Sequence, residues 1–134
     1  MNTWVLICNT QHFNAPLALE ENGYVYWSMK LHFEKNDIAY IYVTGAAGKI
    51  KYKTFVEEID IPFFDGIQKR YLPNHIEEEP DTRKFVKLRL EAINDKPLLY
   101  FSDMKSVGEK LCMVRHFKLN NKPRLIEYIQ DVFC

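Results

Sequence analysis

The stretch DIAYIYVTGAAGKIKYK, residues 37–53, decides the fold that the sequence predicts. Residues 38–43 are mainly β-branched and aromatic, which is typical of a buried strand. The segment GAAG at 45–48 has a glycine at each end and favours a turn. Residues 49–53 then alternate lysine with Ile50 and Tyr52. We therefore expect a β-hairpin with its lysines on one face and its apolar side chains on the other.

Further short elements surround this hairpin. Other strands are predicted at residues 3–8, 24–29, 84–93 and 113–119. Short helices are predicted to begin at three residues whose side chains can cap a helix, Asn14, Ser102 and Asn121. Strands interspersed with three short helices indicate an α+β chain. We expect a small mixed β-barrel with short helices packed at its ends, formed as a single domain over residues 1–134.

The charge balance limits the classes of function. The chain has 134 residues, of which 18 are Lys or Arg and 18 are Asp or Glu, so its net charge is zero. Strong non-specific binding to nucleic acid usually requires a basic surplus. Acidic residues gather in segment 57–81, whereas basic residues gather in 49–53 and 110–124. If folding brings the two basic segments together, a neutral protein still presents one positive face.

Motifs of common enzymes and metal sites are absent from the sequence. There is no GxSxG or HExxH, and the glycines of GAAGKI are too close together for a phosphate-binding P-loop. Cys8, Cys112 and Cys134 form no CxxC pair, which favours reduced thiols in a cytoplasmic protein. No run is apolar and long enough to span a membrane. We expect a binding domain rather than an enzyme, with no metal, no cofactor and no membrane partner.

Aromatic and polar residues at predicted strand ends indicate a binding pocket. Trp27 next to Ser28 couples a stacking surface to a hydroxyl group, and Asn9 and Thr44 end two predicted strands near the mouth of the barrel. Such a cup suits a flipped-out base, which stacks on aromatic rings and is selected by hydrogen bonds to its edge. The predicted base pocket consists of Trp27, Ser28, Asn9, Thr44, Tyr42 and Gly45. The flanking phosphates are expected to contact Lys49, Lys51, Arg115 and Lys118.

Several segments carry a resemblance to a known family. They read WVLICN at 4–9, EENG followed by WS between 20 and 28, and NDIAYIYVTG followed by KIKYK between 36 and 53. On these segments, residues 3–61 resemble the EVE domain, a member of the PUA-like group that includes ASCH and YTH domains. Residues 84–92 fit a later strand of that family, and 121–129 fit its closing helix. At position 36 this chain has Asn where EVE domains usually have Gly.

The resemblance implies an α+β PUA-like barrel with a pocket for a modified or extruded base of DNA or RNA. Trp27 and Ser28 stand where YTH domains place a Trp-Ser pair that forms one cage wall and one hydrogen-bonding group. Asn9 stands where those domains place polar residues near the base. Two alternatives stay open: a protein–protein adaptor in a defence or counter-defence system that uses the same barrel, and a nucleic-acid-modifying enzyme.

Overall fold

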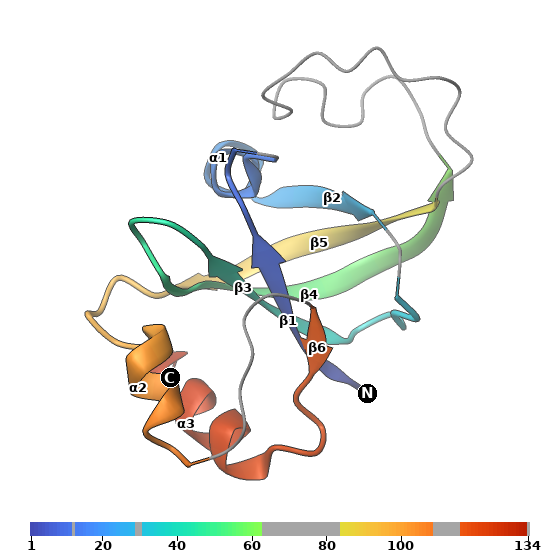
Figure 1. Ribbon diagram of the computed structural model, residues 1–134. Helices are drawn as coiled ribbons and strands as arrows, with labels where there is room; N and C mark the ends of the chain where they lie inside the picture. Colours follow the sequence, from blue (N-terminus) through green and yellow to red (C-terminus); the bar gives the residue numbers. More distant parts are fainter. Residues whose placement is uncertain (12, 29–30, 63–83, 109–115, 134) are drawn as a thin grey trace.

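The computed structural model describes residues 1–11, 13–28, 31–62, 84–108 and 116–133. Within them the chain forms a six-stranded sheet and three helices (Figure 1). In chain order the elements are β1 (Thr3–Cys8), α1 (Ala15–Asn22), β2 (Tyr24–Ser28), β3 (Ile38–Val43), β4 (Lys49–Pro62), β5 (Lys84–Ile93), α2 (Phe101–Lys105), β6 (Phe117–Lys118) and α3 (Pro123–Phe133). No helix in these residues is long and apolar enough to cross a bilayer.

The strand order is β2-β5-β4-β3-β1-β6, and the predicted hairpin is present as β3 and β4. β1 runs parallel to β3, and the other neighbouring pairs are antiparallel. The prediction of a closed barrel is wrong, because a barrel needs every strand paired on both sides. In the described chain, β2 and β6 are two unpaired edges. β6 has 2 residues, which pair with β1, and within the described residues no main-chain ladder joins β6 to β2.

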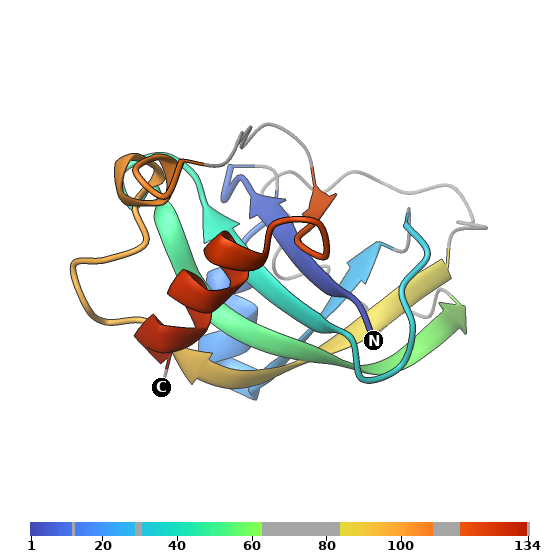
Figure 2. The same cartoon turned by 90° about the horizontal axis from the view of Figure 1, so that it is seen from below.

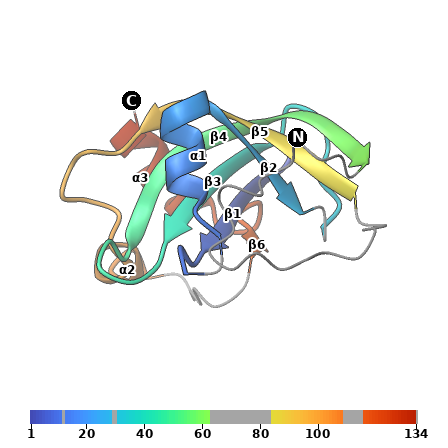
Figure 3. The same cartoon turned by 90° about the horizontal axis from the view of Figure 1, so that it is seen from above.

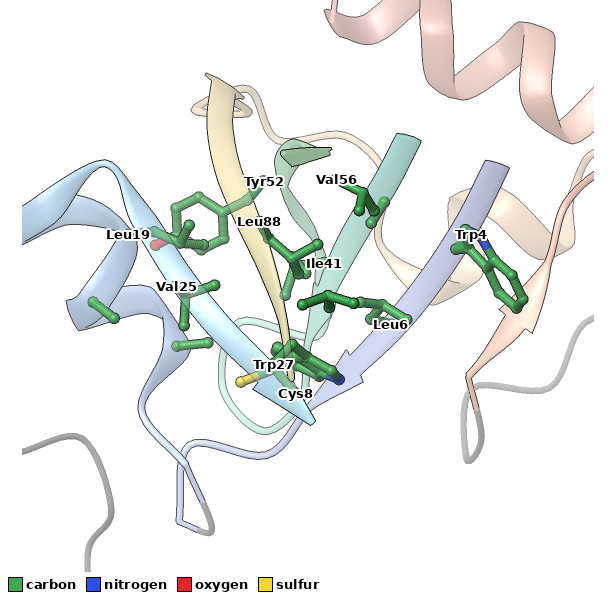
Figure 4. Close-up of a cluster of buried hydrophobic side chains, with 14 of the residues drawn as sticks. Trp4, Leu6, Cys8, Leu19, Val25, Trp27, Ile41, Tyr52, Val56 and Leu88 are labelled. Carbon is green, nitrogen blue, oxygen red and sulfur yellow. The ribbon is translucent and has the colours of Figure 1, made fainter. Parts of the chain in front are cut away.

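Two apolar cores lie on opposite sides of the sheet, as the alternation of side chains along the strands requires. We call them the α1-side core and the α3-side core. The α1-side core includes Leu6, Cys8, Trp27, Ile41, Tyr52 and Val56 (Figure 4). The α3-side core includes Val5, Tyr40, Tyr42, Ile50, Leu125 and Ile129. α3 lies in front of β3 and β4 in Figure 2, and α1 lies over the opposite side of the sheet in Figure 3.

A bulge at Lys51 changes the predicted hairpin. Ile41 pairs with Tyr52 but Tyr42 pairs with Ile50, so Lys51 is an extra residue on β4. The extra residue turns the side chains of Ile50 and Tyr52 to opposite sides of the sheet, into the α3-side and α1-side cores. The expected single apolar face over residues 49–53 is therefore wrong, because strict alternation ends at the bulge.

The predicted capping residues agree with the observed helix starts for α1 but not for α2. Asn14 caps α1 as predicted, with its side chain accepting from the N–H of Leu17, and Gly23 ends this helix at a φ of 79°. Ser102 does not cap α2, because that helix already begins at Phe101. α3 begins at Pro123, where the missing N–H of proline costs no helix hydrogen bond.

Asp37 anchors the start of β3. Its carboxylate is fully buried and accepts three hydrogen bonds. Oδ1 accepts from the backbone N–H of Asn2 at 2.8 Å, while Oδ2 accepts from Trp4 Nε1 and the backbone N–H of Glu34, each at 3.0 Å. Asn36, just before it, has a φ of 73°. This left-handed conformation explains why glycine suits position 36, and asparagine is among the few other residues that tolerate it.

Candidate functional site

A pocket of about 330 Å³ lies where the two edges of the sheet approach each other. It is lined by Ile7, Cys8, Asn9, Phe13, Trp27, Ser28 and His116. These residues come from the end of β1, the segment before α1, the end of β2, and the position just before β6. Ligand pockets usually measure about 300–1,000 Å³, so this volume suits a small ligand such as one heteroaromatic ring.

Trp27 forms the centre of an aromatic wall. Its indole makes edge contacts with Phe13, at a centroid distance of 5.9 Å, and with the His116 ring at 5.7 Å, both at an interplanar angle of 65°. Figure 4 places it beside Cys8, at the ends of β2 and β1. Trp27 borders the pocket but is only 8% exposed, so it offers a small part of its surface and shares the wall with Phe13 and His116.

His116 closes the side of the pocket nearest β6. Its Nδ1 accepts the backbone N–H of Ile7 at 2.9 Å, so this nitrogen is unprotonated and the neutral ring carries its proton on Nε2. Val5 pairs with Phe117, and the His116 ring continues the contact between β1 and β6 beyond that pair. Sequence reasoning did not select His116, because its partner lies 109 positions away and no local motif marks it.

Asn9 and Ser28, two residues of the predicted base pocket, lie in the lining and supply its polar groups. Asn9 Oδ1 accepts from the backbone N–H of Gln11 at 3.0 Å, and this turn holds the side chain at the end of β1. The Ser28 hydroxyl oxygen is buried and has no hydrogen-bond partner within the described residues. A buried hydroxyl without a partner is costly, and a bound polar group would remove that cost.

Cys8 lines the pocket as a neutral thiol. Burial raises the pKa of the Cys8 thiol to about 11, and Sγ donates to the carbonyl oxygen of Phe13 at 3.4 Å. The thiolate is the reactive form of cysteine, so Cys8 is a poor nucleophile at neutral pH. Within the described residues, no group of three His, Cys, Asp or Glu side chains is arranged to hold a metal ion.

We expect Cys8 to react with iodoacetamide about a hundredfold more slowly at pH 8 in the folded protein than in urea, because its pKa is raised from 9.0 to about 11. Peptide mass spectrometry separates Cys8 from Cys112 and Cys134. The raised pKa stabilises the fold below about pH 9, and this contribution is lost as the pH rises towards 11. Burial raises the pKa of Tyr42 too, so other groups also lower the stability at alkaline pH. The contribution of Cys8 is therefore the difference in stability between wild type and Cys8→Ala. Equal labelling rates with and without urea would contradict the expectation.

Three residues of the predicted base pocket lie outside its lining. The backbone N–H of Thr44 donates to the carbonyl oxygen of Cys8 at 3.0 Å, so Thr44 is next to the end of β1 without bordering the pocket. Tyr42 belongs to the α3-side core, on the other side of the sheet from Trp27. Gly45 lies exposed in the β3–β4 turn at a φ of 79°.

The lysines of β4 are not gathered at the pocket. Neither Lys49 nor Lys51 belongs to its lining. Lys49 pairs with Val43 of the α1-side core, whereas Lys53 pairs with Tyr40 of the α3-side core. Paired residues share a face of the sheet, so Lys49 and Lys53 lie on opposite faces. The single positive stripe expected over residues 49–53 is therefore absent.

The other two predicted phosphate contacts lie near β6 in the sequence. Lys118 is exposed on β6, two positions after His116, and its ammonium lies 5.1 Å from the centre of the Trp4 ring. Lys118 pairs with Trp4, near the end of β1 opposite Cys8. At about 3.3 Å per strand residue, it is roughly 13 Å from the level of Cys8. Arg115 lies outside the described residues.

Comparison with known proteins defines the class of fold. No family model and no curated protein sequence matches the chain, but solved structures do. The chain is similar in its α+β fold to solved structures of an ASCH protein from Zymomonas mobilis. The likeness agrees with the expected α+β fold, and it does not single out the EVE domain.

Three solved structures illustrate the likeness. A hypothetical protein from Leishmania major has a TM-score of 0.68 and 14% identity, covering 98% of this chain and 93% of its own. A serine-to-alanine mutant of the ASCH protein from Zymomonas mobilis has a TM-score of 0.64 and 10% identity, covering 98% and 96%. Protein Atu2648 from Agrobacterium tumefaciens has a TM-score of 0.62 and 12% identity, covering 98% and 93%. At these identities the likeness concerns the fold alone.

Proposed function

We propose that this protein is a nucleic-acid-binding module that receives one modified or flipped-out base in the pocket beside Trp27. The observation that carries the proposal is the composition of the lining: three aromatic rings, an amide and a hydroxyl around a volume of about 330 Å³. An aromatic wall stacks against a base of any sequence, and polar groups at the rim select its edge. The ASCH-type fold is compatible with this function.

The neutral lining favours a base over a phosphate as the occupant. Among the described lining residues, none carries a carboxylate, an ammonium or a guanidinium group. A phosphate inside would lose its hydration without gaining a cation, which is unfavourable. An uncharged ring loses much less hydration free energy when it enters the pocket. Ile7 and Cys8 add an apolar part to the lining that suits a methyl substituent.

The polar groups give the pocket its expected selectivity. The Ser28 hydroxyl, buried without a described partner, would gain a hydrogen bond from an occupant. Asn9 would offer its Nδ2 amino group as a donor, while its Oδ1 accepts from the N–H of Gln11 and keeps a second lone pair. Phosphates would stay outside the pocket, where Lys118 is the described candidate contact. We propose that the protein binds the base and does not react with it.

The test is binding of fluorescein-labelled single-stranded RNA and DNA of one mixed sequence, each prepared with and without one methylated or hydroxymethylated base. We expect anisotropy to detect binding near neutral pH that weakens as salt is raised. Asn9→Ala and Ser28→Ala should each lower the affinity by about two- to tenfold. Ser102→Ala, an exposed change on α2, is the matched control and should have no effect.

Absence of binding to all these oligonucleotides at low salt, with the protein folded, would contradict the proposal. Recovery of a specific protein partner in its place would favour the adaptor alternative. Conversion of the oligonucleotide to a new product, detected by mass spectrometry, would favour the enzyme alternative.

A further inference from the structure

We propose that His116 is a positioning residue whose neutral ring holds the pocket in its binding form, so that base binding weakens as the pH falls from about 7.5 to about 5. This inference rests on the proposed function, because it concerns the same pocket. The inference gives a role to His116, which the sequence analysis did not select, and it predicts that binding depends on pH.

The hydrogen bond between Ile7 and His116 requires a neutral ring. The backbone N–H of Ile7 donates to Nδ1 at 2.9 Å, and an imidazole nitrogen accepts only when it carries no proton. A protonated ring has an N–H at both nitrogens and no acceptor. Protonation of Nδ1 would therefore place two N–H groups against each other. The ring would have to leave Ile7, whose N–H would lose this acceptor.

Movement of this ring would change the pocket, because His116 is part of its wall. The ring contacts Trp27 of edge strand β2 and the N–H of Ile7 in β1, next to the other edge strand β6. Its side chain thus connects β2 to β1 at the place where, within the described residues, no main-chain ladder joins the edge strands β2 and β6. When the ring leaves, a base in the pocket loses one of its three aromatic neighbours.

The other described residues of the pocket lining do not change charge over this pH range. From β1, the Cys8 thiol stays neutral, because burial raises its pKa to about 11. The remaining described lining residues carry indole, phenyl, amide, hydroxyl or aliphatic groups, which do not titrate here. On β6, the Lys118 ammonium lies over the Trp4 ring and away from the pocket lining. Among the described lining residues, His116 is therefore the group that changes charge.

The experiment measures the affinity of the same labelled RNA and DNA oligonucleotides between about pH 5 and 8 for wild type, His116→Asn and His32→Asn. In His116→Asn, Oδ1 can accept the Ile7 N–H from nearly the position of Nδ1, but the amide does not titrate. We expect the wild-type dissociation constant to rise about tenfold between pH 7.5 and 5, and that of His116→Asn to change less than about twofold. His32 is exposed and outside the lining, so His32→Asn should behave as wild type.

A second readout needs no ligand. In ¹⁵N-labelled protein, the Ile7 amide resonance should move as His116 titrates, and it should stay fixed in His116→Asn. A flat wild-type binding profile, an equal loss of affinity in His116→Asn, or an Ile7 resonance that does not respond to pH would overturn the inference. Failure of all oligonucleotides to bind near neutral pH would instead contradict the proposed function, while the Ile7 titration would still test the role of His116.

Discussion

We expect the Asp37→Ala variant to have a free energy of unfolding about 3–5 kcal/mol below that of wild type. The substitution removes the acceptor of three hydrogen bonds at a fully buried position, and the N–H groups of Asn2, Trp4 and Glu34 lose their partner. An unsatisfied buried donor costs about 1–3 kcal/mol, which applies in full to the buried Trp4 Nε1 and in part to the partly buried N–H groups of Asn2 and Glu34. Domains are stable by only about 5–15 kcal/mol, so this change removes a large share of the total. Urea unfolding followed by tryptophan fluorescence measures it.

Two further variants separate the lost acceptor from other effects. Asp37→Asn keeps one acceptor oxygen but places an amino group against the remaining donors, so its loss should be about 2 kcal/mol or more. Asp131→Ala, at an exposed position of α3, should change stability by less than about 0.5 kcal/mol. A loss below about 1 kcal/mol in Asp37→Ala would show that the three donors find other partners.

The second large effect concerns Trp27. We expect Trp27→Ala to lower the free energy of unfolding by about 3–5 kcal/mol, because it removes a nearly buried aromatic side chain from the α1-side core. Its affinity for the labelled oligonucleotides should fall by about fivefold or more, since stacking of one base on an aromatic ring contributes about 1–3 kcal/mol. Circular dichroism and anisotropy at the same temperature measure the two effects.

Conservative variants distinguish binding from folding. Trp27→Phe keeps an aromatic ring in the core and should remain folded, with affinity lowered several-fold. Trp4→Phe is its matched control: Trp4 lies at the other end of β1 and outside the pocket lining. It loses the hydrogen bond to Asp37 Oδ2, so its stability should fall while its affinity stays unchanged. If the two variants bind equally well, Trp27 has no part in recognition.

Local sequence patterns predicted the strands well and their register less well. The apolar runs at 3–8 and 38–43 are β1 and β3, because short β-branched and aromatic runs carry a clear signal. The alternation over 49–53 looked regular, yet the bulge at Lys51 divides it. The bulge lets Ile50 pack in the α3-side core and Tyr52 in the α1-side core. An alternating sequence pattern does not reveal that its apolar residues pack on opposite sides of the sheet.

The candidate site was partly predictable for a similar reason. Trp27, Ser28 and Asn9 lie at strand ends, which a sequence can indicate, and all three line the pocket. Phe13 and His116 were not selected, because only the tertiary fold brings them to Trp27. The open sheet was also missed. Whether two edge strands pair depends on their length and position in space, and β6 has only 2 residues.

The link between Ile7 and His116 spans 109 positions of the chain, and this has a consequence for biosynthesis. A ribosome releases β1 and β2 early, so Trp27 and Ser28 are available long before β6 emerges. Contacts between distant segments form late, because the intervening chain must first be ordered. A nascent chain that ends at β5 lacks His116, so one wall of the pocket is missing until the last segment of the chain is synthesised.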